Sequence, residues 1–385
     1  NDILKKLLKP LCLLMSLLTF LSGTVAASAA PSADLVSAPS ALLMDSATGQ
    51  VLFEKESHSQ RPCASITKVM TLLLVFEAID SGKISLTDEV SASAHAASMG
   101  GSDIWLEEGE IMSVDDLIKA TTVASANDAA VALAECISGS EEAFVEQMNK
   151  RAKELKMNDT VFKNCNGLDE DGHITSAYDV AIMSRELIKH KKIFDYCTIW
   201  MDTLRDGKTQ IVNTNKLLKT YNGITGLKTG TTNAAGCCIT ATAERNGFTP
   251  IAVVLGADTG KQRFADAAAL LDYAFAGYTS VSPQEPEDLV DFVEIQNGMQ
   301  KQLPVELNLD GAFLVEKGKE SGIKSKVEFN EEIKAPISVG DTVGTVKYYL
   351  DGKLLGEYRI TAAEDVAEIS FGEVLSLLFQ YLVQF

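Results

Sequence analysis

The pattern of the chain changes once, at Ser282–Pro286, and this change limits what the chain can fold into. Before it, apolar runs of strand length stand on either side of long stretches with helical spacing. After it, short runs alternate apolar and polar residues, and Asp351-Gly352-Lys353 separates two of them as a hairpin turn does. A chain of 385 residues is long enough for two domains. We therefore expect a mixed α/β domain over residues 40–278 and a small all-β domain over 284–366.

The elements expected in the first domain suggest an α/β (α+β) architecture. Its expected strands are Ala41–Met44, Val51–Phe53, Cys237–Ala243 and Ile251–Gly256. Its expected helices run from Ser65 to about Asp80, from 113 to about 157, from Ser176 toward His190, and over Phe264–Phe275. Ser113, Ser140 and Ser176 have the residue type of helix N-caps. Strands at both ends with helices between them indicate one sheet covered by helices, together with a helical lobe.

The N-terminus has the three parts of a secretory signal peptide. Three lysines precede an apolar run from Leu11 to Leu21, and Ala27-Ser28-Ala29 offers a small-residue cleavage site. We expect residues 1–29 to be a signal peptide and 30–39 a linker, which places the mature protein outside the cytoplasmic membrane. The alternative is a membrane anchor that stays attached, although the apolar run is short for a span.

Charge and cysteine content exclude some functions. The formal net charge is −19 and no run of Lys and Arg could follow a phosphate backbone, so we expect no nucleic-acid partner. Six cysteines follow the signal peptide, and no two pairs have zinc-site spacing. A domain of this size needs no disulfides, and we expect mostly free, buried thiols. These are Cys63, Cys136, Cys165, Cys197, Cys237 and Cys238.

The C-terminal segment 367–385 is expected to form an amphipathic helix. Phe371–Phe385 is apolar except for Glu373, Ser376, Gln380 and Gln384, which fall at helical spacing and form one polar stripe. About fifteen residues cannot span a bilayer but can lie in its surface. We expect this helix to attach to the membrane surface; the alternative is packing on a domain or partner.

Three short motifs follow one another in an informative order. They are Ser65-Ile66-Thr67-Lys68 at a helix start, Ser125-Ala126-Asn127 between helices, and Lys228-Thr229-Gly230 in an expected strand. A second S-x-x-K, Ser321–Lys324, lies in the β domain and is attributed to chance. The order and placement of the three motifs therefore carry the functional prediction.

The first motif pairs a hydroxyl with an amine. Serine is a poor nucleophile until a positioned base takes its proton, and residues three apart share one helix face, so Lys68 lies beside Ser65. Lysine is a base only when neutral, so its usual pKa of about 10.4 must fall by about 3 units. Burial under the helical lobe and the nearby cation Lys228 would both lower it.

The other two motifs supply a relay and an anion site. Ser125 can pass a proton between Lys68 and a leaving group, and Asn127 can hold substrate amide and lysine in register; both residue types are also common helix caps. Lys228 and Thr229 offer a cation and a hydroxyl to an anionic substrate end. We expect Gly230 to let a substrate backbone approach the strand.

The remaining requirement of acyl transfer is an oxyanion site. The backbone N–H of Ser65, at the start of its helix, is one available donor, and the N–H of Thr231 is the expected second. The set of groups therefore predicts acyl transfer on a substrate that bears a carboxylate.

These motifs resemble those of the penicillin-binding serine enzymes, and more narrowly of the low-molecular-weight D-alanyl-D-alanine carboxypeptidases. The resemblance covers residues 40 to about 278, and the β domain fits the C-terminal module of that family. It implies a β-lactamase/transpeptidase-like fold with an antiparallel sheet. Besides the three motifs it rests on Arg61–Ser65, Asn166–Asp169, Gly172-His173, Ser176–Asp179 and Asn215–Leu218.

The resemblance implies a role for each motif residue. Ser65 is the acylated nucleophile, Lys68 the base, and Ser125 and Asn127 the relay. Lys228 and Thr229 hold the terminal D-alanine carboxylate, with Arg263 nearby. The substrates are peptidoglycan stem pentapeptides ending in D-Ala-D-Ala, the inhibitors are β-lactams, and neither a metal nor a cofactor is implied.

Two departures from the resemblance concern substrate preference and deacylation. Some relatives have His where this chain has Thr231, and some have His where it has Asn166. Three other functions stay open at this point: a peptidoglycan endopeptidase, a β-lactamase and a wall-binding scaffold without turnover. Against the β-lactamase, no E-x-x-x-N pattern occurs between residues 160 and 180.

Overall fold

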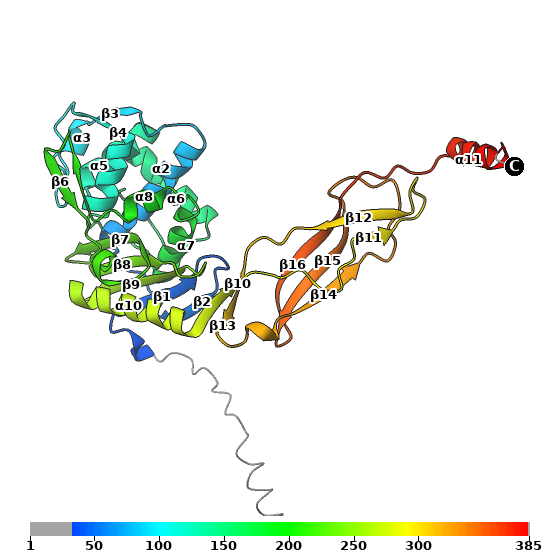
Figure 1. Ribbon diagram of the computed structural model, residues 1–385. Coiled ribbons are helices and arrows are strands. Elements are labelled where there is room, and N and C mark those ends of the chain that lie inside the picture. The colour runs from blue at the N-terminus through cyan, green and yellow to red at the C-terminus, as the bar shows by residue number, and fades with distance from the viewer. Residues whose placement is uncertain (1–32, 384–385) are drawn as a thin grey trace, which may run out of the picture. The chain divides into compact units, whose positions relative to one another are not determined.

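The computed structural model describes residues 33–383, and the expected signal peptide at 1–29 lies outside them. A short 3₁₀ turn, η1 (Ala33–Leu35), precedes the first domain. The body of that domain is a five-stranded antiparallel sheet in the order β2-β1-β9-β8-β7 (Figure 1). The strands are β1 (Ser40–Asp45), β2 (Val51–Lys55), β7 (Ile224–Thr232), β8 (Gly236–Ala243) and β9 (Pro250–Ala257). The four strands expected there are therefore confirmed, and β7, at the edge, is the strand expected to hold Lys228-Thr229-Gly230.

Both faces of this sheet are covered by apolar packing. In β1, Leu42 and Met44 belong to one buried cluster, whereas Ala41 and Leu43 belong to the other. Successive strand residues point to opposite faces, so a strand packed on both sides has no polar alternation. Helix α10 (Gly260–Gly277) covers one face and contributes to the second cluster.

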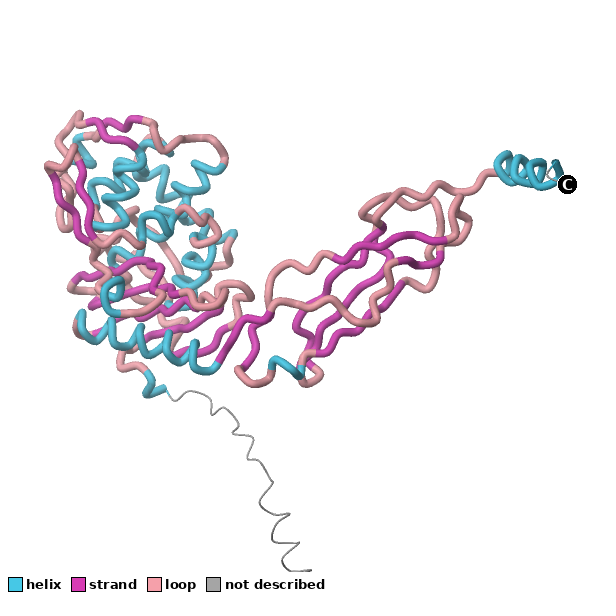
Figure 2. Tube along the Cα trace, in the orientation of Figure 1, coloured by secondary structure: helices cyan, strands magenta, loops and turns pink. Residues whose placement is uncertain are grey.

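The other face of the sheet is covered by the helical lobe, whose helices Figure 2 shows in cyan. Its longer helices are α2 (Lys68–Asp80), α5 (Asn127–Ser138), α6 (Glu141–Glu154) and α7 (Ala177–Leu187). Its shorter helical segments are η2 (Ala64–Thr67), α3 (Ala94–Ala97), α4 (Val114–Lys119), η3 (Ala120–Ala124), α8 (Ile193–Cys197) and α9 (Leu217–Thr220). Two small hairpins complete the lobe: β3 (Glu89–Ser91) with β4 (Ile111–Ser113), and β5 (Met201–Leu204) with β6 (Thr209–Val212).

The long helical stretch expected from 113 to about 157 is interrupted twice. After the π-helical η3, Ser125 takes a left-handed conformation with φ 61°, and Gly139 with φ 83° ends α5. A left-handed residue stops helix propagation, and Gly adopts it without a Cβ penalty. The expected caps Ser113 and Ser140 are confirmed, because each side chain accepts the N–H three residues on.

The second domain is all-β, as expected. Its sheet has the order β11-β12-β16-β15-β14, and β10 pairs separately with β13. Leu303, Val346 and Ile360 are fully buried in its core. The elements are β10 (Tyr278–Val281), β11 (Phe292–Glu294), β12 (Gln302–Leu307), β13 (Phe313–Glu316), η4 (Glu320–Gly322), β14 (Lys324–Phe329), β15 (Thr342–Leu350) and β16 (Lys353–Ala362). The hairpin turn expected at residues 351–353 connects β15 to β16, and Lys353 is already the first residue of β16.

The C-terminal segment is helical over α11 (Phe371–Val383). Several of its apolar side chains are exposed. Phe371 at the start of the helix is 82% exposed, and Leu382 near its end is 74% exposed. No helix among residues 33–383 is long and apolar enough to cross a membrane.

Candidate active site

Ser65 and Lys68 meet at the start of α2. The Lys68 Nζ lies 3.0 Å from the Ser65 Oγ. The α-helix expected to begin at Ser65 begins at Lys68 instead, because residues 64–67 form the 3₁₀ turn η2. Ala64, immediately before the serine, has φ 51°, a conformation that a non-glycine residue rarely adopts. A strained residue at a reactive position is typical of functional sites.

The Lys68 amine is fully buried, with 0% of its surface exposed. It donates hydrogen bonds to the Asn127 Oδ1 at 2.6 Å and to the Asn166 carbonyl at 2.7 Å. A neutral amine has two N–H groups, so these two oxygens use both of them. The lone pair then faces the Ser65 hydroxyl, and the Ser65 O–H donates to it. The arrangement thus suits a neutral lysine that receives a proton.

The pKa of Lys68 agrees with this geometry. Burial lowers it to about 7, because a charged amine loses its hydration inside the protein. The nearby Cys165, Asp103 and Asp128 act in the opposite direction, with smaller effects. A large fraction of the amine is therefore neutral at physiological pH.

Ser125 and Lys228 are joined by a hydrogen bond. The Lys228 Nζ donates to the Ser125 Oγ at 2.8 Å and to the Thr229 carbonyl at 2.9 Å. The left-handed backbone of Ser125 places its hydroxyl between η3 and α5. Burial lowers the pKa of Lys228, and the cations Lys68 and Arg263 lower it further. An arriving carboxylate would restore the charge on Lys228.

Asn127 is the first residue of α5, and its hydrogen bonds join the S-x-N motif to the loop that contains Gly100 and Ser102. Its Nδ2 donates to the Gly100 carbonyl at 2.6 Å, and its backbone N–H donates to the Ser102 carbonyl at 2.7 Å. The side-chain amide is thereby oriented with its oxygen toward Lys68. Its role in this structure is to hold the lysine.

The third motif lies in β7, as expected, at the edge of the sheet. A Cβ on Gly230 would lie 2.8 Å from the Ser65 N and 2.8 Å from the Cys63 carbonyl. The serine turn therefore requires a glycine here, and the expected approach of a substrate backbone stays a prediction. The Thr229 hydroxyl lies beside a further hydroxyl, that of Thr214, at 2.7 Å.

Arg263 comes from α10 and contacts β7 from the face of the sheet that α10 covers. Its Nη1 donates to the Gly230 carbonyl, the Thr231 Oγ1 and the Cys238 carbonyl at 3.0 to 3.3 Å. Its Nε is buried without a hydrogen-bond partner. Burial lowers the pKa of this guanidinium. The cation thus lies at the same end of the site as the K-T-G motif.

Sequence reasoning missed two contacts of the site. One is the Thr214 hydroxyl against Thr229, and the other is the use of the Asn166 backbone carbonyl as an acceptor for Lys68. Asn213-Thr214-Asn215 is a turn, in which the Asn213 side chain accepts the Asn215 N–H. That turn signal indicates where the chain bends, but it does not indicate what the hydroxyl touches.

The cysteines are free thiols throughout the described part of the chain. Cys237 packs against one apolar cluster and Cys238 belongs to the other, so these adjacent residues of β8 point to opposite faces of the sheet. Burial raises the pKa of Cys63 to about 11, which keeps this neighbour of Ser65 protonated. Among residues 33–383, no group of His, Cys, Asp and Glu is placed to hold a metal ion.

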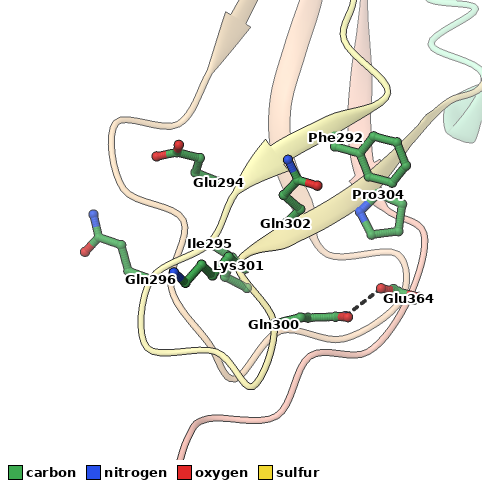
Figure 3. Close-up of a pocket in the computed structure, with 9 residues that line it drawn as sticks. All are labelled: Phe292, Glu294, Ile295, Gln296, Gln300, Lys301, Gln302, Pro304 and Glu364. Carbon is green, nitrogen blue, oxygen red and sulfur yellow. Dashed lines mark hydrogen bonds between the residues drawn. The ribbon is translucent and has the colours of Figure 1, made fainter.

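The small β domain has a groove of its own, drawn in Figure 3. It has a volume of about 700 Å³ and is lined by residues of β11, β12 and the loop that joins them, together with Glu364, to which Gln300 donates a hydrogen bond. Its lining contains amides, carboxylates and the exposed Phe292, but no serine–lysine pair. The groups required for acyl transfer are therefore in the first domain.

Both domains match known families. Residues 26–259 match the D-alanyl-D-alanine carboxypeptidase family, peptidase S11. Residues 278–368 match the C-terminal domain of penicillin-binding protein 5. The two matches follow one another in the order of the two domains described above.

Relatives and solved structures agree with these matches. The chain is 42% identical over 374 residues to D-alanyl-D-alanine carboxypeptidase DacF of Bacillus subtilis, covering 96% of each sequence. It is similar in structure to penicillin-binding protein 5 from Haemophilus influenzae, with a TM-score of 0.75 and 31% identity over 86% of this chain and 98% of that one.

A third match covers a smaller share of the chain. Penicillin-binding protein D2 from Listeria monocytogenes, solved in an ampicillin-bound form, has a TM-score of 0.56 and 33% identity over 64% of this chain and 100% of that chain. The resemblance inferred from the three motifs is confirmed by all of these comparisons. The chain belongs to the D-alanyl-D-alanine carboxypeptidase family of serine peptidases, the low-molecular-weight penicillin-binding proteins.

Proposed function

We propose that this protein removes the terminal D-alanine from peptidoglycan stem pentapeptides through an acyl-enzyme on Ser65. The observation that carries the proposal is the Ser65 Oγ at 3.0 Å from a fully buried amine. Both N–H groups of that amine, in its neutral form, are used by Asn127 and Asn166. A hydroxyl held against a neutral amine is an activated nucleophile.

Acylation begins at the carbonyl of the penultimate D-alanine. The Ser65 Oγ forms a bond to this carbon while its proton moves to the Lys68 Nζ. The backbone N–H groups of Ser65 and Thr231 stabilise the developing oxyanion, and one such donor is worth about 3 kcal/mol in a transition state. The tetrahedral intermediate then expels the terminal D-alanine.

The leaving amine needs a proton, and Ser125 provides the path. Its Oγ accepts a hydrogen bond from the Lys228 Nζ at 2.8 Å. The proton taken up by Lys68 reaches the leaving nitrogen through the Ser125 hydroxyl. Water then attacks the ester on Ser65, with Lys68 again as base, and the shortened peptide is released.

The substrate carboxylate is recognised by the groups along β7. Lys228 supplies a cation and Thr229 a hydroxyl, and Arg263 approaches the same segment through the Gly230 carbonyl. The Thr229 Oγ1 donates to the Thr214 Oγ1 at 2.7 Å, so its O–H must turn from Thr214 to donate to a carboxylate. β-Lactams carry a carboxylate next to a reactive amide, so they would acylate Ser65 and leave slowly.

We also propose that the protein works outside the cytoplasmic membrane. The signal-peptide pattern of residues 1–29 supports export. The exposed apolar side chains of α11 support attachment to a membrane surface, because such a helix otherwise leaves apolar area in water. The helix carries no Lys or Arg, so its affinity for lipid must come from apolar burial.

Replacing Ser65 by Ala tests the nucleophile. Ser65→Ala should reduce D-alanine release from a D-Ala-D-Ala peptide by about 10⁴-fold or more and abolish covalent penicillin labelling. Ser321→Ala is the matched control, because Ser321 begins the other S-x-x-K of the chain. Labelling that survives Ser65→Ala, or that is lost in Ser321→Ala, would place the nucleophile elsewhere. Rapid turnover of the label by the unchanged protein would indicate a β-lactamase.

The pH dependence of acylation tests the base. A lysine with its pKa at about 7 is protonated and inactive in acid. The second-order rate constant for penicillin acylation should therefore fall about tenfold per pH unit below pH 7 and level off above it. Lys68→Arg, which cannot deprotonate, should be slower by about 10²-fold or more at all pH values. A rate that keeps rising to pH 10 in the unchanged protein contradicts the proposal.

Sedimentation with phosphatidylcholine vesicles tests the membrane helix. Phe379→Glu with Leu382→Glu should lower the bound fraction of the full chain about tenfold, since both side chains are exposed in α11. Val339→Glu, an equally exposed apolar position in the β domain, serves as the control and should bind as before. Equal binding by the α11 variant would show that the helix does not attach the protein to lipid.

A further inference from the structure

His173 is a buried histidine with a defined tautomer next to the serine turn. It lies on the loop between α6 and α7 and is 4% exposed. The Lys163 backbone N–H donates to its Nδ1 at 3.1 Å, so that nitrogen is the acceptor. The Nε2 must then carry the proton, and it lies 2.7 Å from the Thr67 Oγ1. The histidine therefore donates a hydrogen bond to the residue between Ile66 and Lys68.

The surroundings of His173 keep it neutral. Burial lowers its pKa to about 4, and the nearby Lys163 also lowers it. The carboxylates Glu170 and Asp169 face it from the same loop and raise the pKa by less. The ring of Phe162 makes an edge contact with it, and Thr67, which also contacts the Cys63 thiol, lies against its Nε2. The Nε2–H donor is thus present throughout the pH range in which Lys68 titrates.

The loop that carries His173 touches the catalytic groups at two further points. The Asn166 carbonyl accepts from the Lys68 Nζ at 2.7 Å. Gly167 lies against the serine turn so closely that a Cβ there would be 1.9 Å from the Ala64 carbonyl oxygen. Ala64 is the strained residue of that turn, and strain persists only where surrounding contacts enforce it.

A fourth contact joins the same loop to the edge strand. The Thr232 hydroxyl, at the end of β7, donates to the Asp169 carboxylate at 2.6 Å. The segment 163–173 thus contacts the lysine, the serine turn and the strand of the K-T-G motif. Of these contacts, the His173–Thr67 bond is the one made by a buried side chain to a side chain of the S-x-x-K motif itself.

We infer that His173 is a positioning residue of this enzyme: its Nε2–H bond to Thr67 holds the loop against the serine turn and keeps the Asn166 carbonyl on the Lys68 amine. The inference rests on the proposed function, because it assigns a role relative to Lys68 as the base. Without the bond, the Asn166 carbonyl is free to move from Lys68 and water can reach the amine. The acylation rate then falls, and the amine becomes easier to protonate.

Two replacements of His173 separate this role from simple packing. His173→Phe keeps a ring of similar size but has no donor, whereas the amide of His173→Gln keeps both a donor and an acceptor. His190→Gln is the matched control, since His190 pairs with Asp80 at the lobe surface. Each variant is labelled with fluorescent penicillin from pH 6 to 10, and the rate is expressed per active molecule from the final amount of label.

The inference predicts a rate effect and a pH effect together. His173→Phe should acylate about tenfold more slowly than the unchanged protein. The acid limb of its rate–pH profile should move to higher pH by about half a pH unit or more. His173→Gln should recover most of the rate and the original pH profile, and His190→Gln should match the unchanged protein. The double variant Thr67→Val with His173→Phe should acylate at about the rate of the slower single variant, because the two replacements remove the same hydrogen bond.

Four outcomes of these measurements would contradict the proposed role of His173 or of Ser65. A His173→Phe variant that acylates within about twofold of the unchanged protein, with the acid limb in place, overturns the inference. A slower rate with an unmoved acid limb, or rate losses that multiply with Thr67→Val, overturns it too, since that is what packing alone would give. If the unchanged protein itself is not labelled at Ser65, the proposed function fails, and that outcome is distinguishable from the others.

Discussion

The structure depends on keeping the Lys68 amine out of water. A charged amine inside a protein loses its hydration, so burial favours the neutral form that can accept a proton. The lobe supplies the Asn127 oxygen and the loop before α7 supplies the Asn166 carbonyl that hold this amine, while the sheet edge packs at Gly230 against the serine turn. The lowered pKa is therefore a property of the whole domain, and no single neighbour produces it.

Close backbone packing is the second condition of the site. The Ser65 turn is flanked by two glycines, Gly167 and Gly230, each so near that a Cβ would overlap its backbone. Ala64 and Ser125 take left-handed conformations beside the reactive groups. Each such conformation in a non-glycine residue costs about 1 to 3 kcal/mol. The buried packing of the two apolar clusters on either side of the sheet offsets this cost.

The sequence was sufficient to predict the groups of the site but not all of their contacts. Short-range geometry placed Lys68 beside Ser65, and the order of the motifs indicated that Ser125 and Lys228 would join them. The helical stretch expected from 113 to about 157 is present but divided, because the left-handed Ser125 and Gly139 stop helix propagation. The hydrogen bond between His173 and Thr67 joins residues that are 106 positions apart in the sequence, and helix or strand periodicity predicts only contacts between near neighbours.

The most direct test of a neutral Lys68 is its own titration. With ¹³C-labelled lysine, the Cε resonance of Lys68 can be followed by NMR from pH 5 to 11 and assigned by its absence in Lys68→Arg. The account predicts a midpoint at about 7, as burial requires. A midpoint near the ordinary lysine value of about 10.4 would mean that the amine is charged at working pH, and the mechanism would be contradicted.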